Sequence, residues 1–421
     1  MRHLARMASA APHKPEPGFR EFVGMIAAMM AMTALAIDSM LPALPDIGNG
    51  LGVTDENDRQ WVIAIFLFGF GAMQIVYGTL SDRFGRKPVL FWGYALYVAF
   101  SLLAALAPSF EVLLIARFMQ GAALAASRVI AVAIVRDRFG GRQMARVMSL
   151  AFIVFMAAPI LAPAMGQIVL FVAPWRWIFG ILAIAGLAVM LWVMRRMPET
   201  LHPEYRLSLS FRRIGRAFRH AATERYSVGY TLGLSLMQGA LIGFLTSAQQ
   251  LFFDVFRHPL WFTPVFALIA STMALANWQN SRIVERLGTR FIAHWALIGF
   301  IAVSAVHLVV ALAGLESIYI FAIFQALVMG CFGLAAANFG AMAMENMSEI
   351  AGSASSVQGC FSTVLGTAIG IGIGQAFNGT TVPFVTGFLI CGLASLAVIL
   401  IAERGKLFGR AELDSVGGGS F

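Results

Sequence analysis

One carboxylate, Asp38, lies in an otherwise uncharged and mostly apolar run between Phe22 and Leu41. A run of this length predicts a transmembrane helix. An ionisable side chain is costly to bury in such a helix, so it normally faces a partner or a wet cavity, where a carboxylate can bind and release a proton. Pro42 and Pro45 follow at once and can end or kink the helix. Asp38 is therefore the first candidate for a functional residue.

Two arginines, Arg117 and Arg128, lie in a later apolar run and could act on that carboxylate. Burial favours the protonated form of a carboxylate and a nearby cation favours the charged form, so movement of the cation would let a proton bind or leave. Arg117 lies only six residues beyond Glu111 and could instead reach the outer membrane interface. Arg128 lies about 16 Å farther along the helix, where it could contact a substrate, lie on the exit route of the Asp38 proton, or simply end the span.

Neutral polar side chains in the apolar runs suit either hydrogen bonds between helices or the lining of a cavity. They are Gln120, Gln238, Gln249, Gln250, Asn277, Gln325, Asn338 and Gln358. The isolated His294 and His307 are expected to be helix-face histidines with satisfied hydrogen bonds. Methionines and phenylalanines such as Met29, Met30 and Phe155 could form the adaptable wall of a pocket for varied ligands. The predicted substrate contacts are Met30, Gln120, Arg128, Phe155, Gln238 and Gln358.

The composition indicates a polytopic membrane protein. Of 421 residues, 59% are hydrophobic and only 12% are charged, whereas about a quarter are charged in soluble domains. The three cysteines, Cys331, Cys360 and Cys391, lack the spacing of a disulfide framework or a zinc site. No Ser/His/Asp, Cys/His or clustered-carboxylate constellation lies within the apolar runs, so neither an enzyme nor a metal or cofactor is expected.

Twelve apolar runs of about 20 residues predict twelve transmembrane helices. They cover residues 22–43, 60–80, 89–108, 110–132, 147–170, 175–194, 227–250, 262–281, 291–313, 317–338, 355–376 and 383–402. Arginines and lysines gather in the loops after spans 2, 4 and 8, and the other face has acidic or nearly uncharged loops, so both termini are predicted to be cytoplasmic. The same rule accounts for the net charge of +9 without a nucleic-acid partner. The loop after span 10 is an exception, with Glu345 and Glu349 but no base.

The spans divide six and six. The predicted domains are a cytoplasmic tail (1–21), a six-helix bundle (22–194), a cytoplasmic linker (195–226), a second six-helix bundle (227–402) and a cytoplasmic tail (403–421). In the linker, Phe211, Ile214 and Phe218 alternate with arginines, which predicts either an amphipathic helix on the membrane surface or a solvated loop helix. Two loops repeat one pattern of acid, base, apolar residue, glycine and base, at 81–87 and 284–290.

The loop after span 2 also carries a resemblance to a known family. Its run Gly78-Thr-Leu-Ser-Asp82-Arg83-Phe-Gly85-Arg86-Lys87-Pro88 resembles the signature cytoplasmic loop of the major facilitator superfamily. Five further runs resemble the Bcr/CflA drug-resistance branch of its drug:proton antiporters. They are Asp38-Ser-Met-Leu-Pro42-Ala-Leu-Pro45, Arg117-Phe-Met-Gln120-Gly121, Arg136-Asp137-Arg138-Phe139, Ala158-Pro159-Ile-Leu-Ala-Pro163-Ala-Met-Gly166 and Ile350-Ala-Gly352-Ser353-Ala354.

The resemblance implies roles for several of these residues. Asp38 would be the proton-coupling carboxylate and Arg117 would modulate it. The loop after span 2, which includes Asp82, Arg83 and Arg86, would be a gating loop. Its Asp82 would face the start of span 11, where Gly352, Ser353 and Ser355 offer the positive end of a helix dipole. Arg86 would pair with Asp137, and such pairs would hold the halves together when the cavity opens outward. A solvated loop whose charge pairs contribute little is the alternative.

The motif in span 5 is associated in the family with export. Pro159 and Pro163 would interrupt the hydrogen-bond ladder of the helix, and Gly166 would let another helix approach closely.

The whole predicts an all-α integral membrane protein of twelve transmembrane helices in two six-helix bundles. It would be a monomer in the cell inner membrane and would export small, varied, largely apolar drugs in exchange for protons, with the proton gradient as its energy source and no cofactor. A proton-coupled uptake symporter for a small polar metabolite is the alternative. That function would need several charged pocket residues, and beyond Asp38, Arg117 and Arg128 the sequence offers none.

Overall fold

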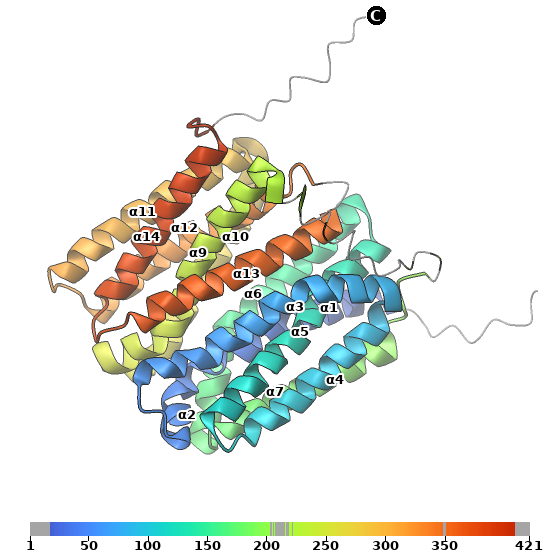
Figure 1. Cartoon of the computed structure of the whole chain (residues 1–421), viewed down its shortest axis with the longest axis horizontal. Helices are drawn as coiled ribbons and strands as arrows, with labels where there is room; N and C mark the ends of the chain where they lie inside the picture. The colour runs from blue at the N-terminus through green and yellow to red at the C-terminus, as the bar shows by residue number, and fades with distance from the viewer. Residues whose placement is uncertain are drawn as a thin grey trace, which may run out of the picture.

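The computed structural model describes residues 17–202, 222–347 and 351–408, with residues 204, 206, 215, 219 and 220 of the linker. The side chains of residues 141, 142, 145, 351 and 353 lie outside this description. The same holds for the predicted amphipathic segment around Phe211, Ile214 and Phe218, and for Glu349. Every regular element in the described residues is a helix (Figure 1).

Twelve segments of the described chain are long and apolar enough to cross a membrane, which confirms the predicted number. The first half contains α1 (Phe19–Asp38), η1 (Leu41–Ala43), α2 (Leu44–Leu51), η2 (Glu56–Gln60), α3 (Trp61–Phe84), α4 (Arg86–Ala105), α5 (Phe110–Arg138), α6 (Gly141–Val172) and α7 (Arg176–Arg196). The second half contains α9 (Arg225–Gln250), η4 (Leu251–Val255), η5 (Pro259–Trp261), α10 (Phe262–Leu287), α11 (Thr289–Leu312), α12 (Ile318–Ala343), α13 (Ala351–Gln375) and α14 (Val382–Ala402).

The first span is broken where the prolines predict it. Helix α1 ends at Asp38, and Pro42 and Pro45 each occupy the first turn of a new short helix, η1 and α2. Proline is tolerated there because the first turn of a helix needs no donor from its backbone nitrogen. Asp38 is consequently the last residue of a long helix, directly before a change of direction.

The two repeated loops have the same backbone. Gly85 joins α3 to α4 with φ 100° and ψ 160°, and Gly288 joins α10 to α11 with φ 83° and ψ 150°. Only glycine adopts this region readily. At Gly85 a Cβ atom would also lie 2.6 Å from Oε2 of Glu199. The internal repeat in the sequence is therefore a repeat of the fold.

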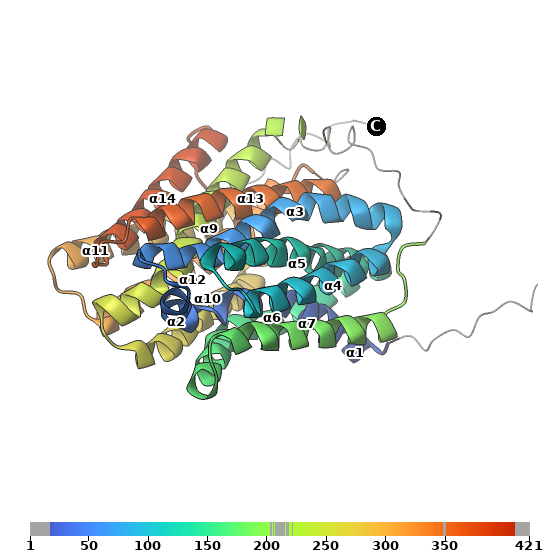
Figure 2. The ribbon, with the colours of Figure 1, turned by 60° about the horizontal axis from the view of Figure 1, so that its bottom comes forward.

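Both described ends of the chain lie at the end of the molecule that carries these glycine turns. Phe19 packs its ring on Phe139 after α5, and the backbone N–H of Phe408 donates to Nδ1 of His294 at the start of α11 (3.1 Å). We call this end the arginine-rich end and the other the opposite end, where α2 lies (Figures 1 and 2). That the arginine-rich end faces the cytoplasm remains a prediction from the charge pattern.

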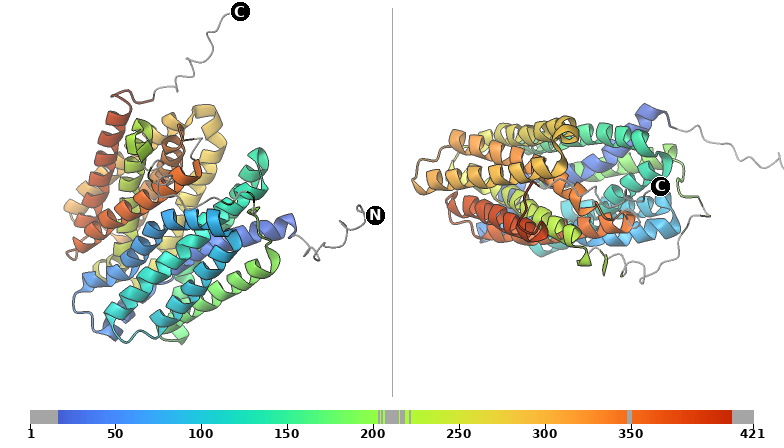
Figure 3. Two further views of the ribbon diagram at one scale, coloured as in Figure 1. Left: turned by 45° about the vertical axis from the view of Figure 1, so that its right-hand side comes forward. Right: turned by 90° about the horizontal axis from the view of Figure 1, so that it is seen from above.

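The halves lie side by side (Figure 3) and meet along two pairs of helices, α3 with α13 and α6 with α10. Glycines permit the first contact. A Cβ atom on Gly71 would lie 2.9 Å from Val364, and one on Gly359 would lie 2.4 Å from the side-chain oxygen of Gln74. Small residues allow this closeness in membrane helices.

A set of neutral amides joins the halves at the opposite end. Gln60 donates to Oε1 of Gln250 (2.5 Å) and to the carbonyl of Gly374 (2.9 Å). Gln250 donates to Oδ1 of Asn57 (2.7 Å), and Gln375 donates to the carbonyl of Asn57 (2.8 Å). We call Asn57, Gln60, Gln250 and Gln375 the amide bridge. It joins η2 of the first half to α9 and α13 of the second half.

Candidate functional site

A cavity of about 440 Å³ lies between the halves. One face of α1 lines it with residues spaced as neighbours on a helix, namely Met30, Thr33, Ala34, Ile37 and Asp38. The α6 wall adds Phe152, Phe155, Met156 and Pro159. The first half also contributes Arg128 from α5 and two residues from α3.

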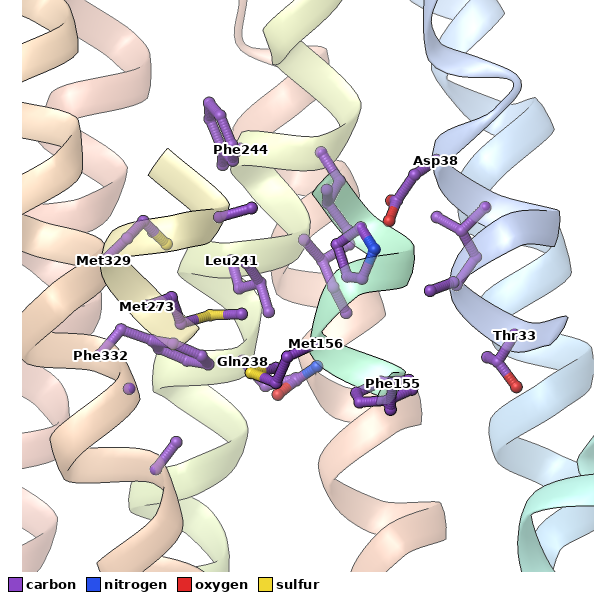
Figure 4. Close-up of a pocket in the computed structure, with 18 of the residues that line it drawn as sticks. Thr33, Asp38, Phe155, Met156, Gln238, Leu241, Phe244, Met273, Met329 and Phe332 are labelled. Atoms are coloured by element: carbon purple, nitrogen blue, oxygen red, sulfur yellow. The ribbon is translucent and has the colours of Figure 1, made fainter. Parts of the chain in front are cut away.

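The second half supplies a mostly apolar wall. Ser362 and Thr363 of α13 belong to this wall. Its other residues repeat the same helical spacing on three helices. They are Leu234, Gln238, Leu241, Ile242, Phe244 and Leu245 of α9, Phe266, Ile269, Ala270, Met273 and Asn277 of α10, and Met329, Phe332, Gly333, Ala336 and Ala337 of α12. Figure 4 shows several of these side chains facing Asp38 across the cavity. This wall carries no charge, so within the described lining only Asp38 and Arg128 are ionisable.

Asp38 points its carboxylate into the cavity (Figure 4). The residue is only 5% exposed. Neither of its carboxylate oxygens has a hydrogen-bond or ion-pair partner in the part of the chain that the structure describes. A buried carboxylate without a partner is costly when charged. Its position at the end of α1 therefore leaves a group free to take up a proton or to meet a ligand.

Arg117 lies behind the cavity wall and is fully buried. Its Nε donates to the carbonyl of Val62 (2.9 Å), and its Nη1 donates to the carbonyl of Ala36 (3.1 Å) and to Oε1 of Gln120 (2.7 Å). The guanidinium also lies 4.4 Å from the centre of the Phe66 ring. Arg117 thus holds the last turn of α1 rather than the Asp38 carboxylate itself, and its burial excludes the interfacial position that the sequence left open.

Arg128 has the opposite environment, although it lies on the same helix. Its side chain is exposed and lines the cavity. No described residue forms a hydrogen bond or an ion pair with it. Helix α5 continues ten residues past it, to Arg138, so Arg128 does not end the span. Of the three roles that the sequence left open, contact with a substrate or with the proton route remains.

Residues 24–371 match the model of the Major Facilitator Superfamily. This chain belongs to that superfamily. The superfamily consists of transporters, so the chain is a transporter and not an enzyme. With twelve membrane-spanning segments and bacterial relatives, it is a multi-pass protein of the cell inner membrane.

Several relatives are similar over most of the chain. A protein of Haemophilus influenzae named "Bicyclomycin resistance protein homolog" is 28% identical over 386 residues, which cover 91% of this chain and 96% of that protein. "Uncharacterized MFS-type transporter YdgK" of Bacillus subtilis is 28% identical over 404 residues, with coverage of 93% and 98%. "Multidrug resistance protein MdtL" of a Shewanella species is 34% identical over 161 residues, or 38% of this chain and 40% of that protein. These similarities agree with the Bcr/CflA resemblance in the sequence.

A solved structure shares the fold. The crystal structure of the human organic anion transporter MFSD10 (TETRAN) superimposes with a TM-score of 0.65 at 18% sequence identity, and covers 93% of this chain and 100% of that chain. An identity this low speaks for the fold alone.

Four of the six predicted substrate contacts line the cavity, and two do not. Met30, Arg128, Phe155 and Gln238 line it. Gln120 instead donates to Oγ of Ser101 (2.6 Å) and accepts from Arg117, so it is a buried structural residue. Gln358 lines a separate cavity of about 260 Å³ between α9 and α13. It lies nearer the arginine-rich end than the main cavity, level with the first turns of α9.

Sequence reasoning missed most of the second wall, including Phe244, Met273, Met329 and Phe332. These residues are apolar, so composition does not separate them from residues that face lipid. The available signal was the spacing i, i+3, i+4 and i+7 on α10 and α12, read together with a polar residue on the same face. Asn277 of α10 is such a residue.

The gating loop of the first half forms ion pairs within that half. Arg86 binds Asp137 of α5 through Nε (2.9 Å) and Asp82 of α3 through Nη1 (2.6 Å). Glu199, which follows α7, accepts from the backbone N–H groups of Arg86 (2.9 Å) and Lys87 (3.0 Å) and so caps α4. The predicted Arg86–Asp137 pair is present. In this structure it ties α3, α4 and α5 together and does not connect the halves.

Two other residues of that loop, Arg83 and Asp82, make no hydrogen bond or ion pair with the second half among the interactions of the described residues. Arg83 is exposed and lies 5.3 Å from the centre of the Phe84 ring. Asp82 pairs with Arg86, while the side chain of Ser353, its predicted neighbour at the start of span 11, lies outside the described residues. That Asp82 binds the end of this helix in another state remains a prediction.

The second half has an equivalent cluster that explains the loop after span 10. Arg290 binds Glu345 after α12 (3.0 Å) and Glu403 after α14 (3.0 Å). Tyr230 of α9 donates to Glu403 and contacts Nε2 of His294 (3.1 Å). Glu345, in the loop without a base of its own, is therefore paired with Arg290, which lies 55 residues earlier in the chain.

The proline motif places α6 against the end of α1. Pro159 and Pro163 both lie inside the continuous helix α6, and Pro159 lines the cavity. At Gly166 a Cβ atom would lie 2.1 Å from the carbonyl oxygen of Ser39. The close approach that the motif predicts is thus made to the residue that follows Asp38. Arg117 and Gly166 hold this turn from two sides.

Proposed function

We propose that this transporter exports small, structurally varied, largely apolar drugs in exchange for protons. Two relatives bear the names of bicyclomycin and multidrug resistance proteins, and the cavity wall is mostly apolar with methionine and phenylalanine side chains, which adapt to varied ligands. The observation that carries the proposal is the unpaired Asp38 carboxylate on that wall. The protein acts as a monomer and uses the proton gradient without a cofactor.

The exchange follows from competition at Asp38. We infer that a drug enters from the arginine-rich end while Asp38 is charged, since the amide bridge holds the halves together at the opposite end. After the cavity opens to the other side, a proton binds Asp38 and the drug leaves. Drug and proton stabilise different states of one site, and coupling requires that difference in affinity.

The change of state requires the amide bridge to open. Its hydrogen bonds join neutral groups, each of which contributes about 1 kcal/mol net, and water can replace them. The ion pairs of Arg86 and Arg290 lie within single halves. The halves can thus move as bundles without breaking either of these ion-pair clusters.

Everted membrane vesicles from cells that express the chain test the exchange. Energised vesicles acidify their interior, and we expect wild-type vesicles to accumulate ethidium until a protonophore is added. Asp38→Asn removes the titratable group and keeps the size, so the gradient-driven accumulation should fall to background. Asp46→Asn, which changes an exposed acid of α2, should accumulate ethidium at the wild-type rate.

Wild-type accumulation by Asp38→Asn vesicles would overturn this mechanism. Uptake that runs in the opposite direction, so that ethidium is lost from preloaded energised vesicles, would point to a symporter instead. Expression of each variant in the membrane is measured on the same preparations, so that a low signal is not mistaken for low activity.

A further inference from the structure

We propose that Asp38 and Arg128 form a two-point site for zwitterionic amphipathic molecules, in which Asp38 receives a cationic amine and Arg128 receives an anionic group such as a carboxylate. The proposal names a substrate class for the cavity and rests on the proposed function only in that these molecules are its cargo. It is carried by the placement of the two charges and by the walls between them.

Both side chains line the same cavity, and their backbone positions lie about 13 Å apart along the direction of α1. Oγ of Ser127 donates to the carbonyl of Met29 (2.8 Å), which sets the root of Arg128 level with the middle of α1. Asp38 lies nine residues farther along that helix. An arginine side chain is long and rotatable, so a ligand of about 10 to 14 Å can reach both groups.

The exposed guanidinium of Arg128 has no counter-ion among the described residues, so it is available to an anionic group of a ligand. The α6 residues that line the same cavity, Phe152, Phe155, Met156 and Pro159, offer no side-chain group that accepts a strong hydrogen bond. Asp38 is the only acid in the described lining and lies more than two helical turns away. A carboxylate or sulfonate would accept two parallel hydrogen bonds from the guanidinium, which is the geometry that arginine favours.

The wall between the charges suits an apolar body. On α1 it consists of Met30, Thr33, Ala34 and Ile37, and across the cavity it consists of Leu241, Met273 and Phe332. A ligand would therefore place an aromatic or aliphatic middle here, with opposite charges at its ends. Burial of that middle adds about 25 cal/mol for each Å² removed from water.

This arrangement reconciles an anion-binding residue with proton exchange. The amine of a zwitterion competes with the proton at Asp38, as the exchange requires, while its anion stays on Arg128. A monocation of the same shape keeps the competition and gains nothing from Arg128. Dependence on Arg128 should consequently separate zwitterions from monocations.

Binding to the purified full chain in detergent tests the site without a proton gradient. The probes are ciprofloxacin, which has a piperazinium and a carboxylate, and its methyl ester, which has only the cation. We expect Arg128→Gln to weaken ciprofloxacin binding about tenfold or more and to change the Kd of the ester by less than about twofold. Arg128→Lys keeps the charge but loses the paired donors and should give an intermediate Kd for ciprofloxacin.

Retention of ester binding shows that Arg128→Gln is folded. Equal weakening of both probes, or wild-type affinity of Arg128→Gln for ciprofloxacin, would refute the two-point site. A wild-type protein that binds the ester as tightly as ciprofloxacin would do the same. The outcome is independent of the vesicle experiment, since equilibrium binding needs no exchange and ethidium carries no anionic group.

Discussion

Two stretches of α5 hold an arginine in an apolar span, and they use it in different ways. Around Arg117 the helix packs against α1 and α3, and every part of the guanidinium except Nη2 has a hydrogen-bond acceptor. Around Arg128 the helix borders the cavity, and the guanidinium is exposed without a described partner. Arg117 therefore stabilises the packing of the helices, whereas Arg128 is available to a ligand.

The difference shows that a charge inside a membrane span acquires its role from its neighbours. Ionisable residues in such spans are functional by default, and both arginines meet that criterion equally. What separates them is that Arg117 finds the carbonyls of Ala36 and Val62, whereas Arg128 faces open space. The turn that carries Asp38 is therefore positioned by an arginine that need not touch the substrate.

The largest expected effect comes from the removal of Arg117. Arg117→Leu removes three buried hydrogen bonds donated by the charged guanidinium and should destabilise the protein by about 3 kcal/mol. Arg128→Leu removes no described interaction and should change stability by less than about 0.5 kcal/mol. Thermal midpoints of the two variants, followed by size-exclusion of the heated samples, measure the difference.

An Arg117→Leu protein with the thermal midpoint of the wild type that lost only proton-driven transport would contradict a structural role for Arg117. That result would favour the direct modulation of Asp38 that the family resemblance implies.

A smaller effect is expected from the second contact that holds the end of α1. Gly166→Ala places a methyl group against the carbonyl of Ser39, so we expect a loss of about 1 to 3 kcal/mol and slower ethidium transport. Gly330→Ala on α12 is the matched control, because no atom lies within 4 Å of its added Cβ. A Gly166→Ala protein with the stability and transport rate of the control would show that this approach does not position Asp38.

The smallest effect is expected where an arginine is exposed and paired. Arg196 binds Glu21 through two hydrogen bonds of 2.6 and 2.7 Å, but both side chains are partly in water. Arg196→Gln should lower the thermal midpoint by less than about 2 °C, and the loss should vanish in 1 M salt, where charges are screened within about 3 Å. Arg195→Gln, at an exposed neighbour, serves as the control. A shift as large as that of Arg117→Leu would mean that burial does not determine how much each arginine contributes to stability.

Much of the fold could be predicted because the signals are local. The length of each apolar run sets a span, the prolines after Asp38 set the break, and the lone carboxylate marks a cavity. The repeated glycine turns at Gly85 and Gly288 could be recognised from a few residues each. The domain boundaries and the cytoplasmic side of the termini remain predictions.

The rest depended on contacts between distant parts of the chain. Gln120 and Gln238 look alike in sequence, yet one binds Arg117 and the other faces the cavity. Glu345 lacked a base until Arg290 was seen beside it. The apolar wall of the second half could not be told from a lipid-facing surface, because both favour the same side chains.

The neutral side chains of the amide bridge determine how the contact between the halves responds to salt and pH. Asn57, Gln60, Gln250 and Gln375 carry no net charge, so salt does not screen the hydrogen bonds that they make between the halves. None of them titrates in the physiological range either. We therefore expect the contact between the halves at this end to keep its strength when the salt concentration or the pH of the surroundings changes.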